Sequence, residues 1–154
     1  MITLMEMNEI EFKKYVDFMI PEYAREVVKN FDLTMEQALE ESKMMIDGLF
    51  TDGLCTSGQY LFTIRDANSN EKIGILWYQL NTETKRAFLN HIYIDEPNRG
   101  KGYGYKTLEK FQHNLKEADI KSIGLSVFES NDDAYRIYKK LGYSTTRKDM
   151  EIIL

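Results

Sequence analysis

The most constraining feature of the sequence is a strand-like segment that leads into a glycine-rich turn and then into a helix. Residues 86–94 alternate, with Phe88, Asn90, Ile92 and Ile94 expected on one side and Leu89, His91 and Tyr93 on the other. The turn Arg99-Gly100-Lys101-Gly102-Tyr103-Gly104 follows, and apolar residues then recur at helical spacing: Leu108, Phe111, Leu115 and Ala118. This succession indicates a β–α unit within a mixed α/β fold.

The glycine-rich turn has the composition of an anion site. The start of a helix leaves several backbone N–H groups unpaired and carries partial positive charge. Glycines let a backbone approach an anion closely because they have no Cβ. Arg99 and Lys101 add positive charge, and an arginine can bind a phosphate through two hydrogen bonds. The turn is therefore predicted to hold a pyrophosphate.

Three common nucleotide-binding motifs do not fit this turn. A P-loop needs a glycine directly before its Lys-Ser/Thr pair, but Tyr105 precedes Lys106-Thr107. A G-x-G-x-x-G fingerprint needs its third glycine where this chain has Tyr105 or Thr107, depending on the register. A kinase-type glycine loop fails on the same spacing, so the anion belongs to another class of ligand.

The rest of the chain extends the mixed pattern. Helices are predicted to begin at Asn8 and Thr34, each with a capping box, and at Ser130, where Asp133 would complete a third box. The predicted strands cover residues 2–7, 60–64, 73–80, 86–94, 123–127 and 145–154. No linker or repeat divides the sequence, so residues 1–154 are expected to form a single domain.

Composition excludes several classes of function. The formal net charge of -5 disfavours nucleic-acid binding and attraction to an anionic membrane. Neither a membrane-spanning run nor a signal-peptide pattern is found, and Cys55 is the lone cysteine, so a cytoplasmic location is expected. Two histidines and one cysteine far apart in sequence give no metal-binding pattern.

A second segment narrows the choice of ligand for the turn. Arg99, Gly102 and Gly104 fill the pattern [Q/R]-x-x-G-x-[G/A], and Asn131-x-x-Ala134-x-x-x-Tyr138-x-x-x-Gly142-Tyr143 follows. In these two motifs the chain resembles the GNAT superfamily of N-acetyltransferases. The resemblance implies a mixed, mostly antiparallel sheet of about six to seven strands flanked by about four helices. It also implies that the fourth and fifth strands splay apart.

The resemblance further implies acetyl-CoA as cosubstrate, an amine as acceptor and no metal. The pantetheine arm would bind the backbone of Ile92, Tyr93 and Ile94, and the pyrophosphate would meet the N–H groups of residues 99–104. Asn131 would contact the cofactor. Tyr138 would act as general acid when the amine attacks the thioester directly, because a phenol can protonate a departing thiolate.

Several points stay open at the level of sequence. Ser126 occupies the position where some relatives carry a glutamate base, which leaves His91, or Glu129 through a water, as alternatives. Tyr15, Met19 and Tyr23 are interpreted as core residues, with an acceptor groove as the alternative. A non-catalytic acyl-CoA sensor is the competing function. No motif specifies the amine or the oligomeric state, and a homodimer is compatible with the sequence.

Overall fold

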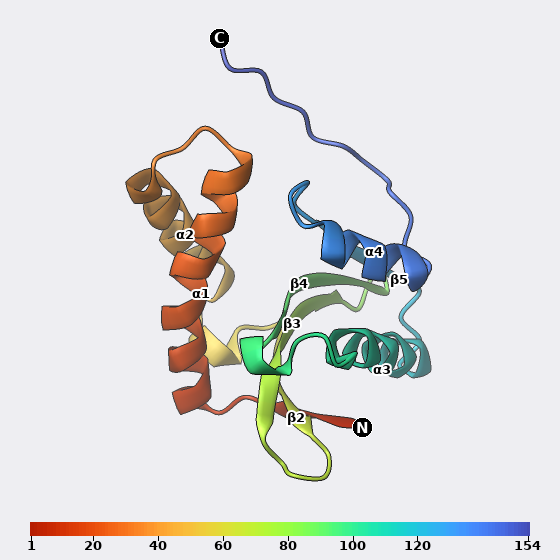
Figure 1. Ribbon diagram of the computed structural model, residues 1–154. Helices are drawn as coiled ribbons and strands as arrows, with labels where there is room; N and C mark the ends of the chain where they lie inside the picture. Colours follow the sequence, from red (N-terminus) through yellow and green to blue (C-terminus); the bar gives the residue numbers. More distant parts are fainter.

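The computed structural model describes residues 1–154 and contains five strands and four α-helices (Figure 1). The strands are β1 (Ile2–Glu6), β2 (Gln59–Asp66), β3 (Lys72–Asn81), β4 (Arg86–Ile94) and β5 (Ser122–Leu125). The helices are α1 (Glu9–Asn30), α2 (Met35–Leu49), α3 (Tyr103–Glu117) and α4 (Asp132–Lys140), with two short 3-10 turns at Gly53–Cys55 and Glu96–Asn98.

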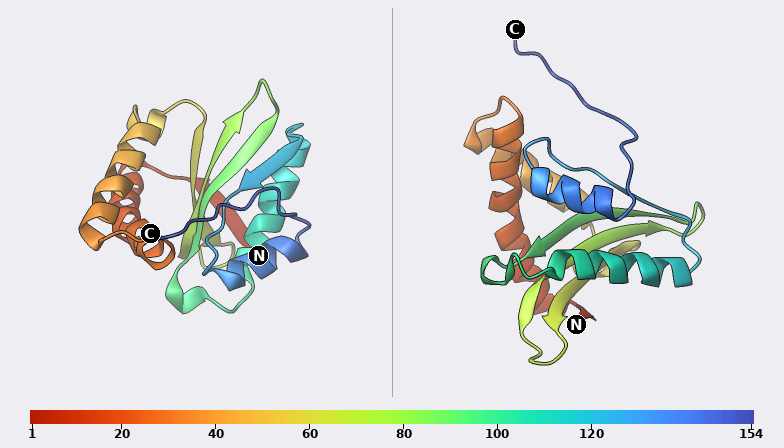
Figure 2. Two further views of the ribbon diagram at one scale, coloured as in Figure 1. Left: turned by 90° about the horizontal axis from the view of Figure 1, so that it is seen from above. Right: turned by 45° about the vertical axis from the view of Figure 1, so that its right-hand side comes forward.

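The strands form one sheet in the order β1-β2-β3-β4-β5. The first four pair antiparallel, with short turns joining β2 to β3 and β3 to β4 and with α1 and α2 between β1 and β2. Strand β5 returns through α3 and pairs parallel to β4. Helices α1 and α2 cover one face of the sheet, and α3 and α4 lie against the other (Figure 2).

Alternation along β3 supplies both faces with core residues. Ile75 and Trp77 pack with Tyr15 and Met19 beneath α1 and α2. On the opposite face, Leu76 joins a cluster of buried residues from β1 to β4, α3 and α4: Ile2, Ile64, Ile73, Ala87, Leu89, Leu108, Phe111, Leu115 and Tyr138. Each face of the sheet therefore has a hydrophobic layer of its own.

The predicted starts of the first two helices are confirmed. The Asn8 side chain accepts a hydrogen bond from the Glu11 N–H at 2.9 Å, and the Glu11 carboxylate accepts one from the Asn8 N–H at 3.1 Å. Thr34 and Gln37 form the same reciprocal pair at the start of α2. The third predicted capping box is wrong, because Asn131 rather than Ser130 caps α4.

The alternation predicted for residues 86–94 is wrong in its second half. Trp77 pairs with His91 and Tyr78 pairs with Leu89, so Asn90 is an additional residue in β4 and forms a β-bulge. Ile92 and Ile94 consequently lie on the same face as Leu89, packed against the α3 and α4 core. The bulge shifts every side chain after it to the other face of the sheet.

The strand predicted at 145–154 is absent. Residues 144–154 have no regular secondary structure, and the chain runs away from the sheet toward the C-terminus (Figure 1). This tail leaves five strands rather than the expected six to seven. An alternating segment becomes a strand only when a neighbouring strand pairs with it, and here β5 forms the edge of the sheet.

Candidate active site

The central feature of the site is a gap between β4 and β5. The two strands pair from Arg86 with Ser122 to Leu89 with Leu125, and β5 then ends. Because β4 continues to Ile94, its residues after Leu89 have no strand partner on the β5 side. The Asn90 bulge stands where the pairing stops, and a bulge bends its strand. The predicted backbone positions, Ile92 to Ile94, therefore lie along the open part of β4.

The glycine-rich turn leads into α3 with unpaired backbone donors. Gly100 and Gly102 have φ values of +74° and +79°, which glycine adopts without the strain that a Cβ would bring. The first helical hydrogen bond of α3 runs from the Lys106 N–H to the Gly102 carbonyl at 3.1 Å. The backbone N–H groups of residues 100–105 make no backbone hydrogen bond.

Helix α3 differs from the other three helices at its N-terminus. No side chain caps α3, and its first turn contains no acidic residue. Helices α1, α2 and α4 each have a side-chain cap together with one or two acidic residues in the first turn. The positive end of the α3 dipole is thus the one that the chain leaves without an anionic or polar partner.

The two basic residues of the turn are placed differently. The Arg99 Nε–H donates to the Ile94 carbonyl at 2.9 Å, and the guanidinium lies 4.9 Å from the centre of the Tyr93 ring. Its remaining N–H groups are exposed beside the end of β4. Lys101 is exposed on the turn. The observed residues therefore fit a pyrophosphate through backbone N–H groups, one held guanidinium and one exposed ammonium.

Tyr138 lies in the core cluster of the α3 and α4 face. This cluster contains Leu89 and also contacts Leu125, the last paired residues of β4 and β5. The Tyr138 ring meets the Tyr143 ring edge-on, with the ring centres 5.6 Å apart. Burial raises the pKa of Tyr138 to about 12, so the phenol is protonated at neutral pH. Tyr138 thus belongs to the same core cluster as Leu89, the last residue of β4 that pairs with β5.

Asn131 has a local structural role. Its side-chain oxygen accepts a hydrogen bond from the Ala134 N–H at 3.2 Å and caps α4. The side-chain amide N–H₂ group stays exposed at the start of the helix. A contact with acetyl-CoA therefore remains a prediction for this group.

The candidates for a general base are now distinguishable. His91 Nδ1 and the Tyr15 hydroxyl share a hydrogen bond of 2.8 Å across the α1–sheet interface. Burial lowers the pKa of His91 to about 4, which makes it a weak base near neutral pH. This geometry favours a structural role for His91. Ser126 and Glu129 are exposed on the segment that follows β5.

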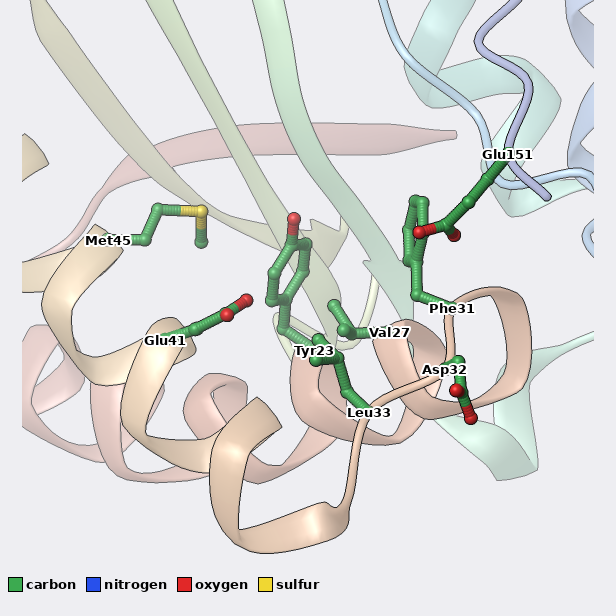
Figure 3. Close-up of a pocket in the computed structure, with 8 residues that line it drawn as sticks. All are labelled: Tyr23, Val27, Phe31, Asp32, Leu33, Glu41, Met45 and Glu151. Atoms are coloured by element: carbon green, nitrogen blue, oxygen red, sulfur yellow. The ribbon is translucent and has the colours of Figure 1, made fainter. Parts of the chain in front are cut away.

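A cavity of about 350 Å³ opens between the C-terminal half of α1 and α2 (Figure 3). Its lining combines apolar side chains with three carboxylates: Tyr23, Val27, Phe31, Asp32, Leu33, Glu41, Met45 and Glu151. Tyr15 and Met19 are buried core residues, as the sequence predicted, whereas Tyr23 lines this cavity. Burial and the nearby Glu41 raise the pKa of Tyr23.

Aromatic contacts connect this cavity to the gap between the strands. Phe128, in the loop after β5, packs against Tyr23 and Phe31 with ring centres 5.8 Å and 6.2 Å apart. The Asn30 side-chain amide donates to the Ser130 hydroxyl at 3.0 Å and holds the same loop against the end of α1. An acceptor in the cavity would therefore lie beside the segment that joins β5 to α4.

Comparison with known proteins identifies this arrangement. The model of the acetyltransferase (GNAT) family matches residues 24–143, and these include the gap, the turn and Tyr138. The chain belongs to the GNAT acetyltransferase family. The predicted resemblance is thereby confirmed, and the sheet and helices form a mixed α/β GNAT fold. Activity as an N-acetyltransferase is supported by this membership.

Relatives of this GNAT acetyltransferase agree with that assignment. The uncharacterized N-acetyltransferase YycN of Bacillus subtilis is 30% identical over 147 residues, 94% of each chain. A crystal structure of that putative acetyltransferase has a TM-score of 0.94 to this one, covering 100% of this chain and 99% of the other. A spermine/spermidine N(1)-acetyltransferase of Bacillus subtilis is 37% identical over 67 residues, 43% of this chain and 44% of its own.

Two further features of this GNAT acetyltransferase concern ligands and membranes. No group of three or more His, Cys, Asp or Glu side chains is placed to hold a metal ion. None of the helices combines the length and the hydrophobicity that a membrane crossing requires.

The bulge at Asn90 is the functional element that the sequence patterns did not reveal. The Asn90 side-chain nitrogen is buried and lacks a hydrogen-bond partner. A polar residue between Leu89 and His91 was the available signal, since an interior asparagine is unfavourable in a regular strand.

Replacing Gly102 by valine tests the turn. A side chain at its φ of +79° strains the backbone, although an added Cβ would meet no atom within 4 Å. We expect the dissociation constant for acetyl-CoA, measured by calorimetry, to rise at least about tenfold, because displaced N–H groups no longer converge on one anion. Gly142→Val is the matched control, since Gly142 also has positive φ, +96°, and open space. Equal binding by both variants would remove the turn from the site.

Two substitutions separate the roles of Asn131. Asn131→Ala removes the cap of α4 and should lower the free energy of unfolding by about 1 kcal/mol, measured with urea. Asn131→Ser retains a capping oxygen but lacks the amide N–H₂ group. Weaker acetyl-CoA binding in both variants, with stability lost mainly in the alanine variant, is expected. A serine variant that binds like the native chain would leave Asn131 with the cap alone.

The pKa of His91 predicts how stability depends on pH. Its folded pKa of about 4 lies below the ordinary 6.5, so the unfolded chain takes up a proton first as pH falls. The resulting stabilisation is complete above about pH 6.5 and is lost toward pH 4. Between pH 7 and pH 5 the free energy of unfolding should fall by about 2 kcal/mol from this group.

Urea titrations at both pH values measure this loss. His91→Gln should remove this part of the pH dependence. His113→Gln, which changes the exposed histidine of α3, should keep it. An unchanged pH dependence in the His91 variant would contradict the assignment.

Proposed function

We propose that this protein transfers an acetyl group from acetyl-CoA to a primary amine by direct attack, with Tyr138 as general acid. The observation that carries the proposal is the conjunction of an uncapped α3 N-terminus with an unpaired stretch of β4. The first supports binding of a pyrophosphate, and the second supports binding of an extended amide-bearing chain by strand-like hydrogen bonds. Acetyl-CoA carries both groups in that order.

The proposed reaction is the attack of the amine on the thioester of acetyl-CoA. The uncharged amine nitrogen attacks the thioester carbonyl carbon, a C–N bond forms and the C–S bond breaks. The departing CoA thiolate takes the Tyr138 proton, the amine nitrogen releases a proton to solvent as the amide forms, and the Tyr138 phenolate takes up a proton from solvent. A phenol is protonated near neutral pH, and burial raises the pKa of Tyr138 further, to about 12.

The incoming amine needs a route for its proton. Alkylamines are protonated near neutral pH and must become neutral before they attack. Glu129 is the carboxylate that the β5–α4 loop exposes near the gap, and it can pass the proton through a water to solvent. This assignment leaves the Tyr15–His91 hydrogen bond intact.

A cationic acceptor suits the cavity between α1 and α2. Glu41 and Glu151 add negative charge to walls that are otherwise largely apolar, as an alkylamine with a second ammonium requires (Figure 3). The partial similarity to a spermine/spermidine N(1)-acetyltransferase supports the same class of acceptor. A panel of mono-, di- and polyamines, read out by CoA thiol release, is the direct screen.

Tyr138→Phe tests the proposed acid. We expect turnover to fall about 100-fold or more, the usual contribution of a general acid, while the acetyl-CoA dissociation constant changes less than about twofold. Thiol release measures the first quantity and calorimetry the second. Tyr143→Phe is the control, because it removes a hydroxyl from the ring that packs against Tyr138. Unchanged turnover in the Tyr138 variant would exclude it as the acid.

The sensor alternative predicts a different outcome from the same panel. A non-catalytic acyl-CoA-binding domain would bind acetyl-CoA tightly and release no thiol with any amine. The buried Tyr138, in the core cluster that contains Leu89, supports the enzyme, because binding alone does not require a proton donor there.

A further inference from the structure

A β-turn joins β5 to α4, and the sheet does not hold it. The Asn131 N–H donates to the Phe128 carbonyl at 2.9 Å, which closes the turn with Glu129 and Ser130 at its centre. Pairing with β4 has already ended at Leu125, so the turn has no strand neighbour. Its position is therefore set by contacts with other parts of the chain.

The first of these contacts is a reciprocal pair of hydrogen bonds with the last residue of α1 (Figure 1). The Asn30 Nδ2 atom donates to the Ser130 hydroxyl at 3.0 Å, and the Ser130 N–H donates to Asn30 Oδ1 at 3.3 Å. The same Asn30 amide donates to the Glu26 carbonyl at 2.7 Å, which fixes its orientation on the helix. Asn30 thus joins the turn to α1, although the two residues are 100 positions apart in the chain.

The second contact is apolar and is made by Phe128 at the other end of the turn. Its ring packs against Tyr23 and Phe31, and both of these residues line the cavity between α1 and α2. Glu129 therefore lies between two anchors, the Phe128 ring before it and the Ser130 hydrogen bonds after it. Both anchors hold the turn to the C-terminal part of α1, which also forms a wall of the cavity.

We propose that Asn30 is a positioning residue for acetyl transfer, which holds Glu129 where it takes the proton of the acceptor amine through a water. This inference rests on the proposed function, in which Glu129 provides that route. Asn30 does not line the cavity, so it acts through Ser130 and not on the acceptor. Because the turn and the cavity wall are held to the same helix, the carboxylate and a bound amine keep a defined separation.

Asn30→Ala removes both hydrogen bonds to Ser130 and tests the anchor. We expect kcat/KM for the amine, measured by thiol release, to fall roughly tenfold, because a displaced proton acceptor slows the transfer. The acetyl-CoA dissociation constant, measured by calorimetry, should change less than about twofold, since the start of α3 is untouched. Spermidine is the first probe, and the panel amine with the highest turnover replaces it if spermidine releases no thiol. Lys29→Ala is the matched control, because the Lys29 ammonium pairs with Glu26 on α1, and it should keep the native values.

Two substitutions of Ser130 separate the anchor from the stability of α1. Asn30→Ala also removes the hydrogen bond to the Glu26 carbonyl, whereas changes at Ser130 leave α1 as it is. Ser130→Ala removes the hydroxyl that accepts from Asn30 and should lower kcat/KM for the amine, by less than Asn30→Ala does. Ser130→Thr keeps a hydroxyl and should retain the native value. Equal kcat/KM in the two serine variants would contradict the anchor.

A double-mutant cycle with Glu129→Gln tests whether Asn30 acts through that carboxylate. Glu129→Gln should lower kcat/KM for the amine by itself, and adding Asn30→Ala should then lower it no further, whereas independent effects would multiply. Multiplied losses, or native kcat/KM in the Asn30→Ala single variant, overturn the positioning role.

Failure of the proposed function gives different results in the same measurements. Native kcat/KM in the Glu129→Gln single variant rejects the proton route through Glu129, and the positioning role of Asn30 falls with it. A native chain that binds acetyl-CoA but releases no thiol with any amine of the panel rejects acetyl transfer as a whole. The positioning role alone fails when Glu129→Gln is impaired and Asn30→Ala is not.

Discussion

The rest of the structure depends on the hydrogen bonds that β4 does not make. Asn90 adds one residue to the strand, pairing with β5 stops at Leu89, and the backbone beyond it stays open. Unpaired strand groups are normally a liability because any extended chain can bind them. In the proposed function, the open backbone of β4 and the uncapped start of α3 would hold the extended chain of acetyl-CoA.

The helix termini reinforce this arrangement through electrostatics. In α1, α2 and α4, a side-chain cap and acidic residues of the first turn interact with the positive end of the helix dipole. These helices contribute to the packing of the domain. The fourth, α3, is packed just as firmly through Leu108, Phe111 and Leu115, but its N-terminus has no such partner. In the proposed function, the same helix would contribute packing along its length and ligand binding at its N-terminus.

Sequence patterns correctly predicted the features that depend on residues close to one another in the chain. Strand β4 has the bounds expected from its alternation, and the boxes at Asn8 and Thr34 formed, because spacing within one turn decides them. The bulge was missed since its position depends on how β4 pairs with β3. The last strand, at 145–154, was predicted from a valid alternating pattern, but no neighbouring strand pairs with this segment in the structure. Of the site residues, the turn and Tyr138 followed from motifs, whereas the cavity carboxylates come from segments that only folding brings together.

The uncapped start of α3 has a consequence for the lifetime of the protein. A ligand that binds only the folded chain stabilises it by RT ln(1 + [L]/Kd), about 2.7 kcal/mol at a hundredfold excess over Kd. Most helix ends are stabilised by capping side chains of the same protein, and this stabilisation does not depend on the concentration of any ligand. In the proposed function, the stabilisation of the α3 N-terminus would come from bound acetyl-CoA. The concentration of acetyl-CoA would then set how often the domain unfolds and becomes accessible to proteases. Abundance in the cell would then follow metabolic state without any dedicated regulator.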